Sequence, residues 1–406
     1  MLATNGDEMR VDLLTREYPP NVYGGAGVHV TELARVLREH IDVQVRCFDG
    51  PREDGDGVTG YSDPAGLAGA NAALRTLGVD LEMAADTAGA DVLHSHTWYA
   101  NMAGHLGGLL NDVPHIVSAH SLEPLRPWKA EQLGGGYALS SWAEKTAYEG
   151  AARVIAVSGG MREDILRSYP SLDPDDVVVV HNGIDLAGWA RPSEDVIDAV
   201  AQQFGVDRSR PTVIFVGRIT RQKGLPYLLR AVQQLPPEVQ LVMCAGAPDT
   251  PEIANEVSTA FLGLREQRTG VVWIEEMLPR QQVSALLAAS TVFVCPSVYE
   301  PLGIVNLEAM AVGLAVVGSA TGGIPEVIDD GVTGLLVPIE QATDGTGTPV
   351  HPDQFVGDLA AALTSMTDDP ARAASMGAAG RQRAEDHFSW ESIAERTLDV
   401  YRGVLA

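Results

Sequence analysis

Residues 212–224 read TVIFVGRITRQKG, an apolar run of strand length that ends in a basic loop bounded by glycines. Arg218, Arg221 and Lys223 follow directly after the predicted strand Thr212–Val216, and a predicted helix begins near Leu225. Open α/β sheets bind ligands at the carboxyl ends of their strands. The stretch therefore predicts a parallel sheet with an anion site, because Arg218 offers a bidentate fork and Lys223 a compact charge to a diphosphate. The alternative is a solvated basic loop, and for Arg221 a side chain that only faces water.

Runs rich in Val and Ile alternate with helix-length segments along nearly the whole chain, as in parallel sheets covered by helices. The predicted strands before this stretch are Val11–Leu14, Val43–Phe48, Asp91–Ser95, His115–Ala119, Arg153–Val157 and Val177–Val180, and those after it are Val239–Cys244, Val271–Ile274, Thr291–Cys295 and Ala315–Gly318. A chain of 406 residues is too long for one core, so we predict two Rossmann-like domains, at 9–190 and 205–385. Asn182–Arg210 is interpreted as a linker, and Asp49–Gly66 as a surface loop. The last segment, 386–406, predicts an amphipathic helix that packs on a domain.

Composition excludes several classes of partner. Asp and Glu outnumber Lys and Arg by 54 to 28, and the net charge of -26 disfavours nucleic acid and anionic lipid. Met1–Glu8 is polar, and no segment approaches the apolar length of a membrane span, so we expect a cytoplasmic protein without membrane contact. The cysteines, Cys47, Cys244 and Cys295, lie inside apolar runs and are predicted to be reduced core residues. The oligomeric state, monomer or homodimer, is left open.

A second motif, EPLGIVNLE at residues 300–308, follows the predicted strand Thr291–Cys295 and opens a helix. Gly303 permits close approach of a ligand to the backbone, and the amides of Leu302, Gly303 and Ile304 would form an anion site at the helix N-terminus. Glu300 lies just outside the helix, where a carboxylate can accept hydrogen bonds from sugar hydroxyls. Glu308 lies more than one turn inside and points elsewhere, such as toward a ribose diol. Taken singly, each glutamate is more simply a helix-start charge or an exposed helical acid.

The pair of motifs, GRITRQKG and a later E-x7-E, resembles the retaining sugar-nucleotide transferases of glycosyltransferase family 4. The resemblance implies the GT-B fold: two Rossmann-like domains whose parallel sheets face a cleft, with the C-terminal helix crossing back to the N-terminal domain. It also implies roles for four residues. Glu300 would contact the transferred hexose, Glu308 the ribose, and Arg218 and Lys223 the diphosphate.

The N-terminal half adds candidate residues that the resemblance identifies. The turn YPPNVYGGAGVHV, residues 18–30, matches the family's glycine-rich loop, in which Gly24 and Gly25 would face the donor. His120, which ends the predicted strand His115–Ala119, matches a histidine beside the anomeric carbon and is a catalytic candidate. The following loop, Ser121–Tyr137, holds Arg126, Trp128 and Lys129. With Tyr23, they are predicted to bind the acceptor, because long ordered loops are usually functional.

These stretches, with HSHTWY at residues 94–99, resemble the part of the family that contains glycogen synthases and maltose-1-phosphate synthases. The expected reaction is retaining transfer of glucose from ADP-glucose to the 4-hydroxyl of glucose 1-phosphate or of an α-1,4-glucan end. Val22 and Thr97 stand where many glycogen synthases have Lys and Asp, which weakens the expectation of processive elongation.

Two rival functions and one metal site remain as alternatives. The rivals are transfer of mannose or N-acetylglucosamine to a lipid or inositol acceptor, and epimerisation of a sugar nucleotide. His94 and His96 could suggest metal ligands, but Asp91 is the only carboxylate near them in sequence. The resembled family works without metal, so no metal and no cofactor beyond the donor are expected.

Overall fold

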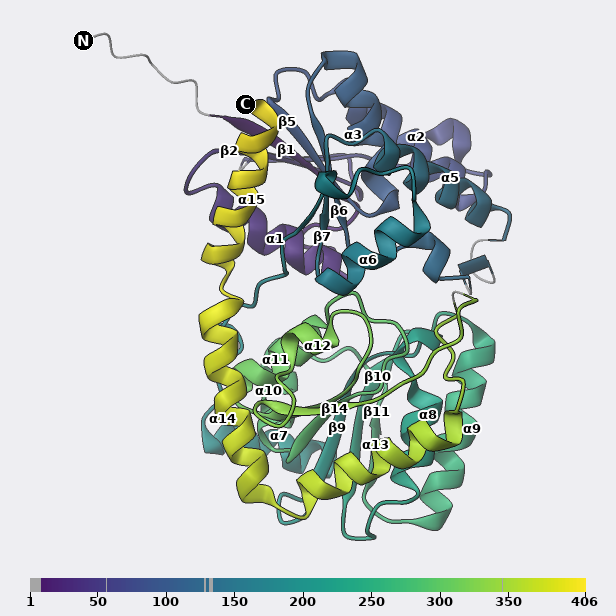
Figure 1. The fold of residues 1–406 in the computed structure, drawn as a ribbon, viewed down its shortest axis with the longest axis vertical. Helices are drawn as coiled ribbons and strands as arrows, with labels where there is room; N and C mark the ends of the chain where they lie inside the picture. Colours follow the sequence, from purple (N-terminus) through teal and green to yellow (C-terminus); the bar gives the residue numbers. More distant parts are fainter. Residues whose placement is uncertain (1–8, 56, 128, 131–133, 345) are drawn as a thin grey trace, which may run out of the picture. The chain divides into compact units, whose positions relative to one another are not determined.

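The computed structural model describes residues 9–55, 57–127, 129–130, 134–344 and 346–406. The chain divides into two compact units (Figure 1). Unit 1 comprises the residues up to Gly183 together with Trp390–Ala406, and unit 2 comprises Ile184–Ser389.

Unit 1 is built on a mainly parallel sheet in the order β3-β4-β2-β1-β5-β6-β7-β8, in which β3 and β4 pair antiparallel. Its strands are β1 Arg10–Leu14, β2 Asp42–Cys47, β3 Arg52–Asp54, β4 Val58–Gly60, β5 Val92–His96, β6 His115–Ala119, β7 Arg153–Ala156 and β8 Val177–Val179. Its α-helices are α1 Gly25–Leu37, α2 Ala72–Ala85, α3 Trp98–Asn111, α5 Gly136–Glu149, α6 Gly159–Ser168 and α15 Trp390–Leu405.

Unit 2 has a parallel sheet in the order β11-β10-β9-β12-β13-β14. Its strands are β9 Thr212–Arg218, β10 Gln240–Gly246, β11 Val271–Ile274, β12 Val292–Cys295, β13 Ala315–Ser319 and β14 Gly334–Val337. Its α-helices are α7 Glu194–Phe204, α8 Leu225–Val232, α9 Pro251–Gln267, α10 Arg280–Ala288, α11 Ile304–Val312, α12 Ile324–Val327, α13 Pro352–Thr367 and α14 Pro370–His387.

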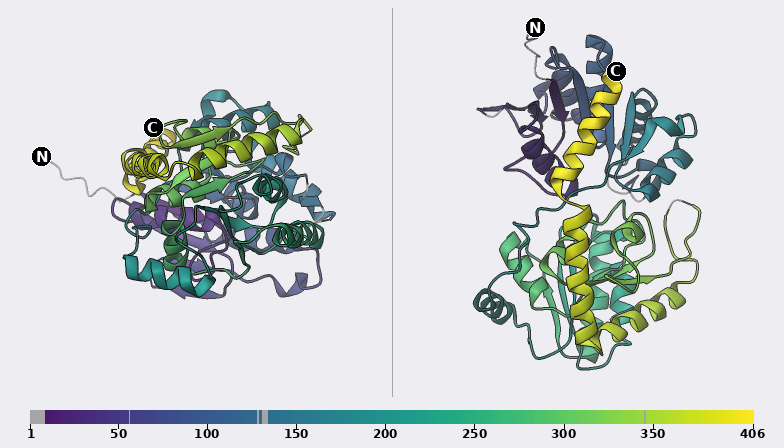
Figure 2. Two further views of the ribbon diagram at one scale, coloured as in Figure 1. Left: turned by 90° about the horizontal axis from the view of Figure 1, so that it is seen from below. Right: turned by 60° about the vertical axis from the view of Figure 1, so that its left-hand side comes forward.

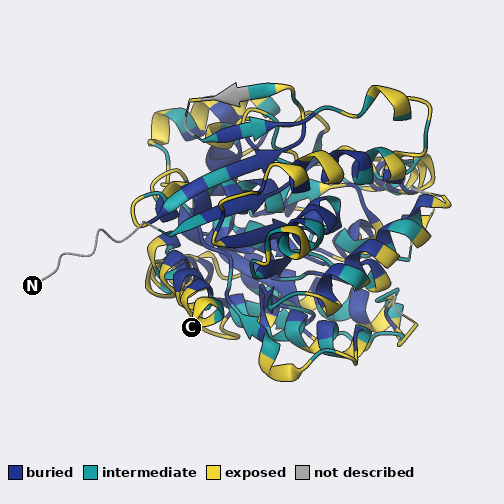
Figure 3. Ribbon diagram, turned by 90° about the horizontal axis from the view of Figure 1, so that it is seen from above, coloured by how far each residue is buried: buried dark blue, intermediate teal, exposed yellow. Residues whose placement is uncertain are grey.

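Burial explains why the apolar runs form strands. Strand residues are buried on both faces of each sheet, while helices expose one side (Figure 3). The three cysteines are buried free thiols, as predicted. Within the described residues, no helix is both long enough and apolar enough to cross a membrane.

Helix α15 belongs to unit 1, although unit 2 precedes it in the sequence. Trp390, Ile393, Leu398 and Tyr401 are buried in one core cluster with strand β1 and helix α1. The yellow helix lies beside α1 in Figure 1, and Figure 2 shows it from a second side. The predicted return of the C-terminal helix to the N-terminal domain is confirmed.

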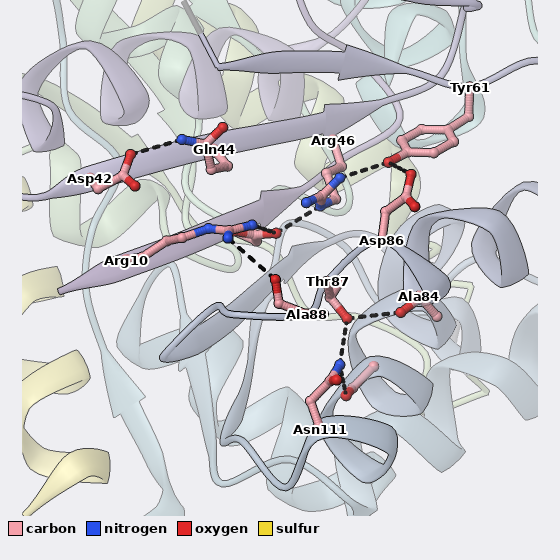
Figure 4. A network of polar contacts seen from close by, with 12 residues as sticks. Arg10, Asp42, Gln44, Arg46, Tyr61, Ala84, Asp86, Thr87, Ala88 and Asn111 are labelled. Atoms are coloured by element: carbon pink, nitrogen blue, oxygen red, sulfur yellow. Dashed lines mark hydrogen bonds and ion pairs between the residues drawn. The ribbon is translucent and has the colours of Figure 1, made fainter.

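A buried ion pair fixes β1 to β2 in unit 1. The Arg46 Nε donates to Asp12 Oδ2 at 2.7 Å, and an Arg46 Nη donates to the Tyr61 hydroxyl, which donates to Asp86 (Figure 4). Asp12 is fully buried, so the pair offsets a desolvation cost that neither charge could bear alone. Burial raises the pKa of Tyr61 to about 12, which keeps this hydroxyl a donor.

Three interpretations of the sequence are wrong in detail. Asn182–Arg210 is no irregular linker, because it contains helix α7, whose Ile197 is buried in unit 2. Asp49–Gly66 contains the short strands β3 and β4, which extend the sheet edge. Strand β14 is missing from the prediction because it is short and directly follows a turn.

Candidate active site

The carboxyl ends of β9 and β12 lie side by side, because these strands are neighbours in the sheet of unit 2. Gly224, at φ +64°, ends the basic loop after β9. A Cβ atom at this position would lie 1.9 Å from the carbonyl oxygen of Pro296, which follows β12. The Val298 N–H also donates to the Gln222 carbonyl at 2.8 Å. The glycine and this bond therefore hold the two motif loops in contact.

This contact brings Lys223 to Glu300. The Lys223 Nζ donates to Glu300 Oε2 at 2.6 Å, and the Ser297 hydroxyl donates to the same oxygen at 3.0 Å. Both charged side chains are largely buried. Burial lowers the pKa of Lys223, but the charge of Glu300 outweighs it, so the net pKa lies above its ordinary value and the amine stays protonated.

The other two cations of the basic loop are exposed. Arg218 donates to Asp249 at 3.0 Å. The positive charge of Arg218 also lowers the pKa of Lys223, so the two cations are close enough to interact electrostatically. Arg221 forms a longer ion pair with Glu256, at 3.8 Å, on the surface. The structure therefore joins Arg218 and Lys223 in one site and leaves Arg221 at its edge.

Helix α11 begins at Gly303, which has φ +95°. No side chain caps this end, and its first turn has no acidic residue, so the amides of the Leu302–Ile304 segment keep the positive end of the helix dipole. Both polar atoms of the buried Asn306 side chain lack a hydrogen-bond partner. A buried amide of this kind commonly waits for a ligand or water. Sequence reasoning missed Asn306, although it lies inside the E-x7-E motif.

Glu308 belongs to the same group of residues. Burial raises its pKa to about 7, while the charges of Arg280 and Lys223 lower it. The carboxyl therefore changes charge near neutral pH. A group with such a pKa inside a cleft or pocket is a candidate functional group rather than a surface acid.

A cavity of about 220 Å³ lies at the carboxyl ends of β9, β10 and β11. It is lined by Arg218 and Gly246, and by the segment Glu275–Leu278 that follows β11. Its mainly apolar walls and its position suit a flat ring system such as a nucleobase. The sequence contained a signal, since Glu275–Leu278 follows a strand end, but no residue type in it indicated a ligand.

In unit 1, the glycine loop is organised by Glu17, which sequence reasoning missed. Its carboxylate accepts hydrogen bonds from the N–H groups of Tyr23 and Gly24, both at 2.8 Å. The amide of Gly24 is therefore bonded within the protein, and the contact of Gly24 and Gly25 with the donor stays a prediction. Gly25 is exposed at the start of α1. Tyr23 is exposed and donates its hydroxyl to Asp49.

His120 lies in a group of histidines in unit 1. Its Nε2 is 3.0 Å from Nδ1 of His96, and its ring centre is 4.7 Å from that of His29. Burial lowers the pKa of His29 to about 4. Burial, with help from neighbouring rings, lowers the pKa of His94, His96 and His120 well below the ordinary value. All four rings are uncharged at neutral pH.

Helix α15 supports this group. The Tyr401 hydroxyl is 2.7 Å from Nδ1 of His94, whose Nε2 is 2.8 Å from the Ser118 hydroxyl. The Trp390 ring lies edge-on to His29, with centres 5.3 Å apart. Asp91, the carboxylate considered beside His94, accepts the Arg10 N–H instead. The described residues therefore give no support to a His94–Asp91 metal site.

The predicted acceptor loop is anchored on α5. Glu144 accepts the Glu123 N–H at 2.8 Å and the Tyr169 hydroxyl at 2.5 Å. Arg126 donates to the Ser121 hydroxyl at 3.0 Å, while its buried Nε has no partner. Lys129 is buried. Trp128 lies outside the described residues.

The structure thus gathers the predicted residues into two groups, one in each unit. Unit 2 joins Arg218, Lys223, Glu300, Glu308 and the start of α11. Unit 1 contains His120 among other histidines, with the glycine loop and the Arg126 loop on the same sheet. The individual roles assigned to these residues stay predictions.

Two family models match the chain. The model described as Glycosyltransferase Family 4 matches residues 23–187, and the model described as Glycosyl transferases group 1 matches residues 210–347. An α-maltose-1-phosphate synthase from Mycolicibacterium smegmatis is 58% identical, with 98% of this chain and 100% of the relative covered. One from Mycobacterium tuberculosis is 55% identical, with the same coverage.

The fold has solved counterparts. A sucrose-phosphate synthase from Thermosynechococcus elongatus has a TM-score of 0.76 at 24% identity and covers 98% of this chain and 99% of its own. The GT-B fold class predicted from the sequence is confirmed. With both family models on the chain and full-length relatives above half identity, the chain belongs to glycosyltransferase family 4.

Proposed function

We propose that the enzyme transfers glucose from ADP-glucose, with retention, to the 4-hydroxyl of glucose 1-phosphate, and releases maltose 1-phosphate and ADP. The observation that carries this proposal is the end-to-end similarity to proteins named α-maltose-1-phosphate synthase, at 55% and 58% identity. The matched region covers 98% of the chain and therefore extends through both units.

The donor residues suit the departure of a diphosphate. The bond between the glucose C1 and the diphosphate oxygen breaks, and a bond from C1 to the acceptor O4 forms on the same face. The proton of the 4-hydroxyl passes to the departing phosphate, so no protein base is required. Arg218, Lys223 and the α11 amides would neutralise the charge that develops, which is electrostatic stabilisation of the transition state.

Glu300 is arranged to hold the sugar. Lys223 and Ser297 both contact its Oε2, which leaves Oε1 to accept a sugar hydroxyl. The ion pair fixes the rotamer of this carboxylate. Glu308 would accept from the ribose, and the cavity beside Glu275–Leu278 would take the base.

The acceptor phosphate is assigned to the Arg126 loop. An arginine binds phosphate through several N–H donors at once, and the buried Nε of Arg126 has no hydrogen-bond partner among the described residues. Lys129 would add a second positive charge. His120 would hydrogen-bond the transferred sugar as a neutral imidazole.

Product analysis tests the proposal directly. The purified enzyme is given ADP-glucose or UDP-glucose, each with glucose 1-phosphate, glycogen or inositol 3-phosphate, and NMR identifies the product and its anomeric configuration. We expect α-maltose 1-phosphate from ADP-glucose and glucose 1-phosphate as the fastest reaction. Faster glycogen elongation, transfer to inositol 3-phosphate, or release of an epimerised sugar without an acceptor would each overturn the proposal.

Arg126→Ala tests the acceptor site. Loss of a charge-assisted contact to phosphate should raise the KM for glucose 1-phosphate by roughly tenfold or more. Transfer to glycogen, which has no phosphate at its end, should change little. Lys145→Ala is the matched control, because Lys145 is an exposed cation on α5 with only a 3.8 Å ion pair to Glu149. Equal effects of Arg126→Ala on both acceptors would remove Arg126 from the phosphate site.

A further inference from the structure

Three histidines of unit 1 converge from three separate segments. His29 lies on α1, His96 ends β5, and His120 directly follows β6. One ring nitrogen of each lies within 4.8 Å of the other two. Parallel strands β5 and β6 are neighbours, and α1 packs beside them, so the fold itself gathers these rings.

The cluster contains hydrogen-bonding capacity that the protein does not satisfy. Among the described residues, both ring nitrogens of His29 and the Nε2 of His96 are buried without a hydrogen bond of good geometry. The Asn182 side chain lies near enough to His29 to raise its pKa by hydrogen bonding, but the geometry leaves the Asn182 Oδ1 unsatisfied as well. His29 is 3% exposed and His96 is fully buried, so bulk water does not supply the bonds. A buried polar group that is left unsatisfied destabilises the folded protein, so each of these nitrogens calls for an explanation.

The chemistry of the donors selects the type of ligand. Neutral imidazoles without a carboxylate suit Zn²⁺, Ni²⁺ or Cu²⁺, whereas Mg²⁺ and Ca²⁺ prefer oxygen ligands. His94 is not available as a fourth ligand, because Tyr401 and Ser118 occupy its two nitrogens.

We infer that His29, His96 and His120 form an inhibitory site for one Zn²⁺ ion or a similar transition metal. Tetrahedral Zn²⁺ holds imidazole nitrogens about 2.0–2.1 Å from the metal. The three rings would therefore move closer together than in the present structure, and the bond between His96 and His120 would break. Three protein ligands leave one position of the metal open. Transfer would stop because the metal occupies His120, the imidazole assigned to the transferred sugar.

Binding is measured without substrate, so its outcome does not depend on the proposed function. Enzyme freed of metal by EDTA and dialysis is titrated with Zn²⁺ by calorimetry and with Co²⁺ by absorption spectroscopy. We expect one Zn²⁺ per chain with micromolar or tighter affinity, and the intense visible bands of tetrahedral Co²⁺. Mg²⁺ should not bind. Absence of a one-to-one Zn²⁺ site, or a Co²⁺ spectrum of the hydrated ion, would overturn the inference.

His29→Gln assigns the site. It should weaken Zn²⁺ binding by at least roughly tenfold, since even outer-shell changes cost 10–100-fold in metal affinity. His351→Gln is the control, because His351 is an exposed histidine of unit 2 and its loss should leave Zn²⁺ affinity unchanged. Unchanged affinity in His29→Gln contradicts the assignment. If that variant does not fold, His96→Gln replaces it, with the same expected loss and the same contradiction.

Inhibition is a separate measurement that rests on the proposed transfer reaction. Zn²⁺ should abolish transfer in the wild-type enzyme at concentrations that fill the site, and EDTA should restore it. Full activity with the site filled would overturn the inhibitory role. Failure of the proposed function would instead show as no transfer in the metal-free enzyme.

Discussion

The predicted donor and sugar residues of the two units hold their polar atoms in different ways. In unit 2, the Lys223 Nζ lies 2.6 Å from Glu300 Oε2, and this contact keeps the pKa of Lys223 above its ordinary value despite burial. In unit 1, burial keeps the rings around His120 uncharged, and several of their nitrogens have no partner. The Arg126 loop also contains a buried group that is held uncharged. Burial, with the nearby Glu123, raises the pKa of Glu144 to about 8.

The difference teaches what each site can do alone. The ion pair between Lys223 and Glu300 is already formed in the protein without substrate. A phosphate that binds Lys223 must therefore share this cation with Glu300. The neutral imidazoles carry no charge that would attract a phosphate. They can form hydrogen bonds with sugar hydroxyls without the free-energy cost of burying a charge. We therefore expect unit 2 to stabilise the charge of the donor diphosphate, and the histidine rings of unit 1 to bind sugar hydroxyls.

The largest expected effect comes from Lys223→Ala, which breaks the charged pair. The change removes a cation from the diphosphate and leaves Glu300 buried without its partner. Loss of one such contact typically lowers kcat by about a hundredfold to a thousandfold. Steady-state kinetics with ADP-glucose would measure it. Near-normal turnover would exclude Lys223 from the site.

Arg221→Ala is the matched control for this change. Arg221 lies in the same turn, but it is exposed and its ion pair with Glu256 spans 3.8 Å. Its loss should change kcat less than about threefold, since exposed pairs contribute roughly 0–1 kcal/mol. A loss as large as that of Lys223→Ala would mean that catalysis depends on the total charge of the loop and not on the position of Lys223.

Gly303→Ala tests the α11 end of the unit 2 site. A residue with Cβ is strained at φ +95°, which should lower the free energy of unfolding by about 1–2 kcal/mol. The added Cβ would also lie 2.4 Å from the Asn306 amide and close to the phosphate-binding amides. If the added Cβ displaces these amides from the phosphate, kcat/KM should fall by roughly tenfold to a hundredfold.

Gly313→Ala controls for the strain alone. Gly313 ends the same helix at φ +89°, and its Cβ would meet nothing within 4 Å. It should lose similar stability in thermal unfolding and keep its kcat/KM. If both variants lose activity alike, the α11 end acts only through helix stability.

Glu144→Gln tests whether the buried Glu144 side chain of unit 1 is uncharged in the folded protein. The folded-state pKa of Glu144 is raised from 4.5 to about 8, so the folded protein holds the proton more tightly than the unfolded chain. Wild-type stability from this group is complete below about pH 4.5 and is lost as the pH rises through about 8. The variant removes this loss, so it should gain on the wild type by roughly 4 kcal/mol between about pH 5 and 8.

Urea unfolding at both pH values would measure the difference. Glu149→Gln, at the exposed end of the same helix, is the control and should show no such gain with pH. A pH-independent difference for Glu144→Gln would mean that Glu144 is ionised in the folded protein.

The smallest expected effect is that of EDTA, which should not lower transfer from ADP-glucose and should raise it only in enzyme that carries Zn²⁺ at the histidine site. The charge of the diphosphate is assigned to protein cations and to helix amides, so no metal ion is needed for it. Assay of enzyme before and after prolonged chelation would measure this. Loss of activity would mean that a metal ion shares the task of Lys223.

Much of the fold could be predicted because buried parallel strands are continuous apolar runs. The prediction failed where that rule does not apply. Strands β3 and β4 form a short edge ribbon in a polar stretch, and α7 lies between Pro192 and Gly205, which mark its ends rather than a loop. Only tertiary packing identifies such elements.

The site was predictable as two motifs but not as a geometry. The bond from Lys223 to Glu300 joins residues 77 positions apart, and only the adjacency of β9 and β12 creates it. Glu17 acts through backbone amides of the glycine loop, which no residue pattern reveals. His29 had no sequence signal, because its meaning comes from His96 and His120 across the sheet.

The place of α15 has a consequence for synthesis. Its buried face completes the core of unit 1, but the ribosome adds it only after all of unit 2. During translation, the apolar surface of β1 and α1 that α15 covers stays exposed while the residues of unit 2 are synthesised. We therefore expect nascent unit 1 to expose apolar surface that can aggregate until Trp390–Leu405 has left the ribosome.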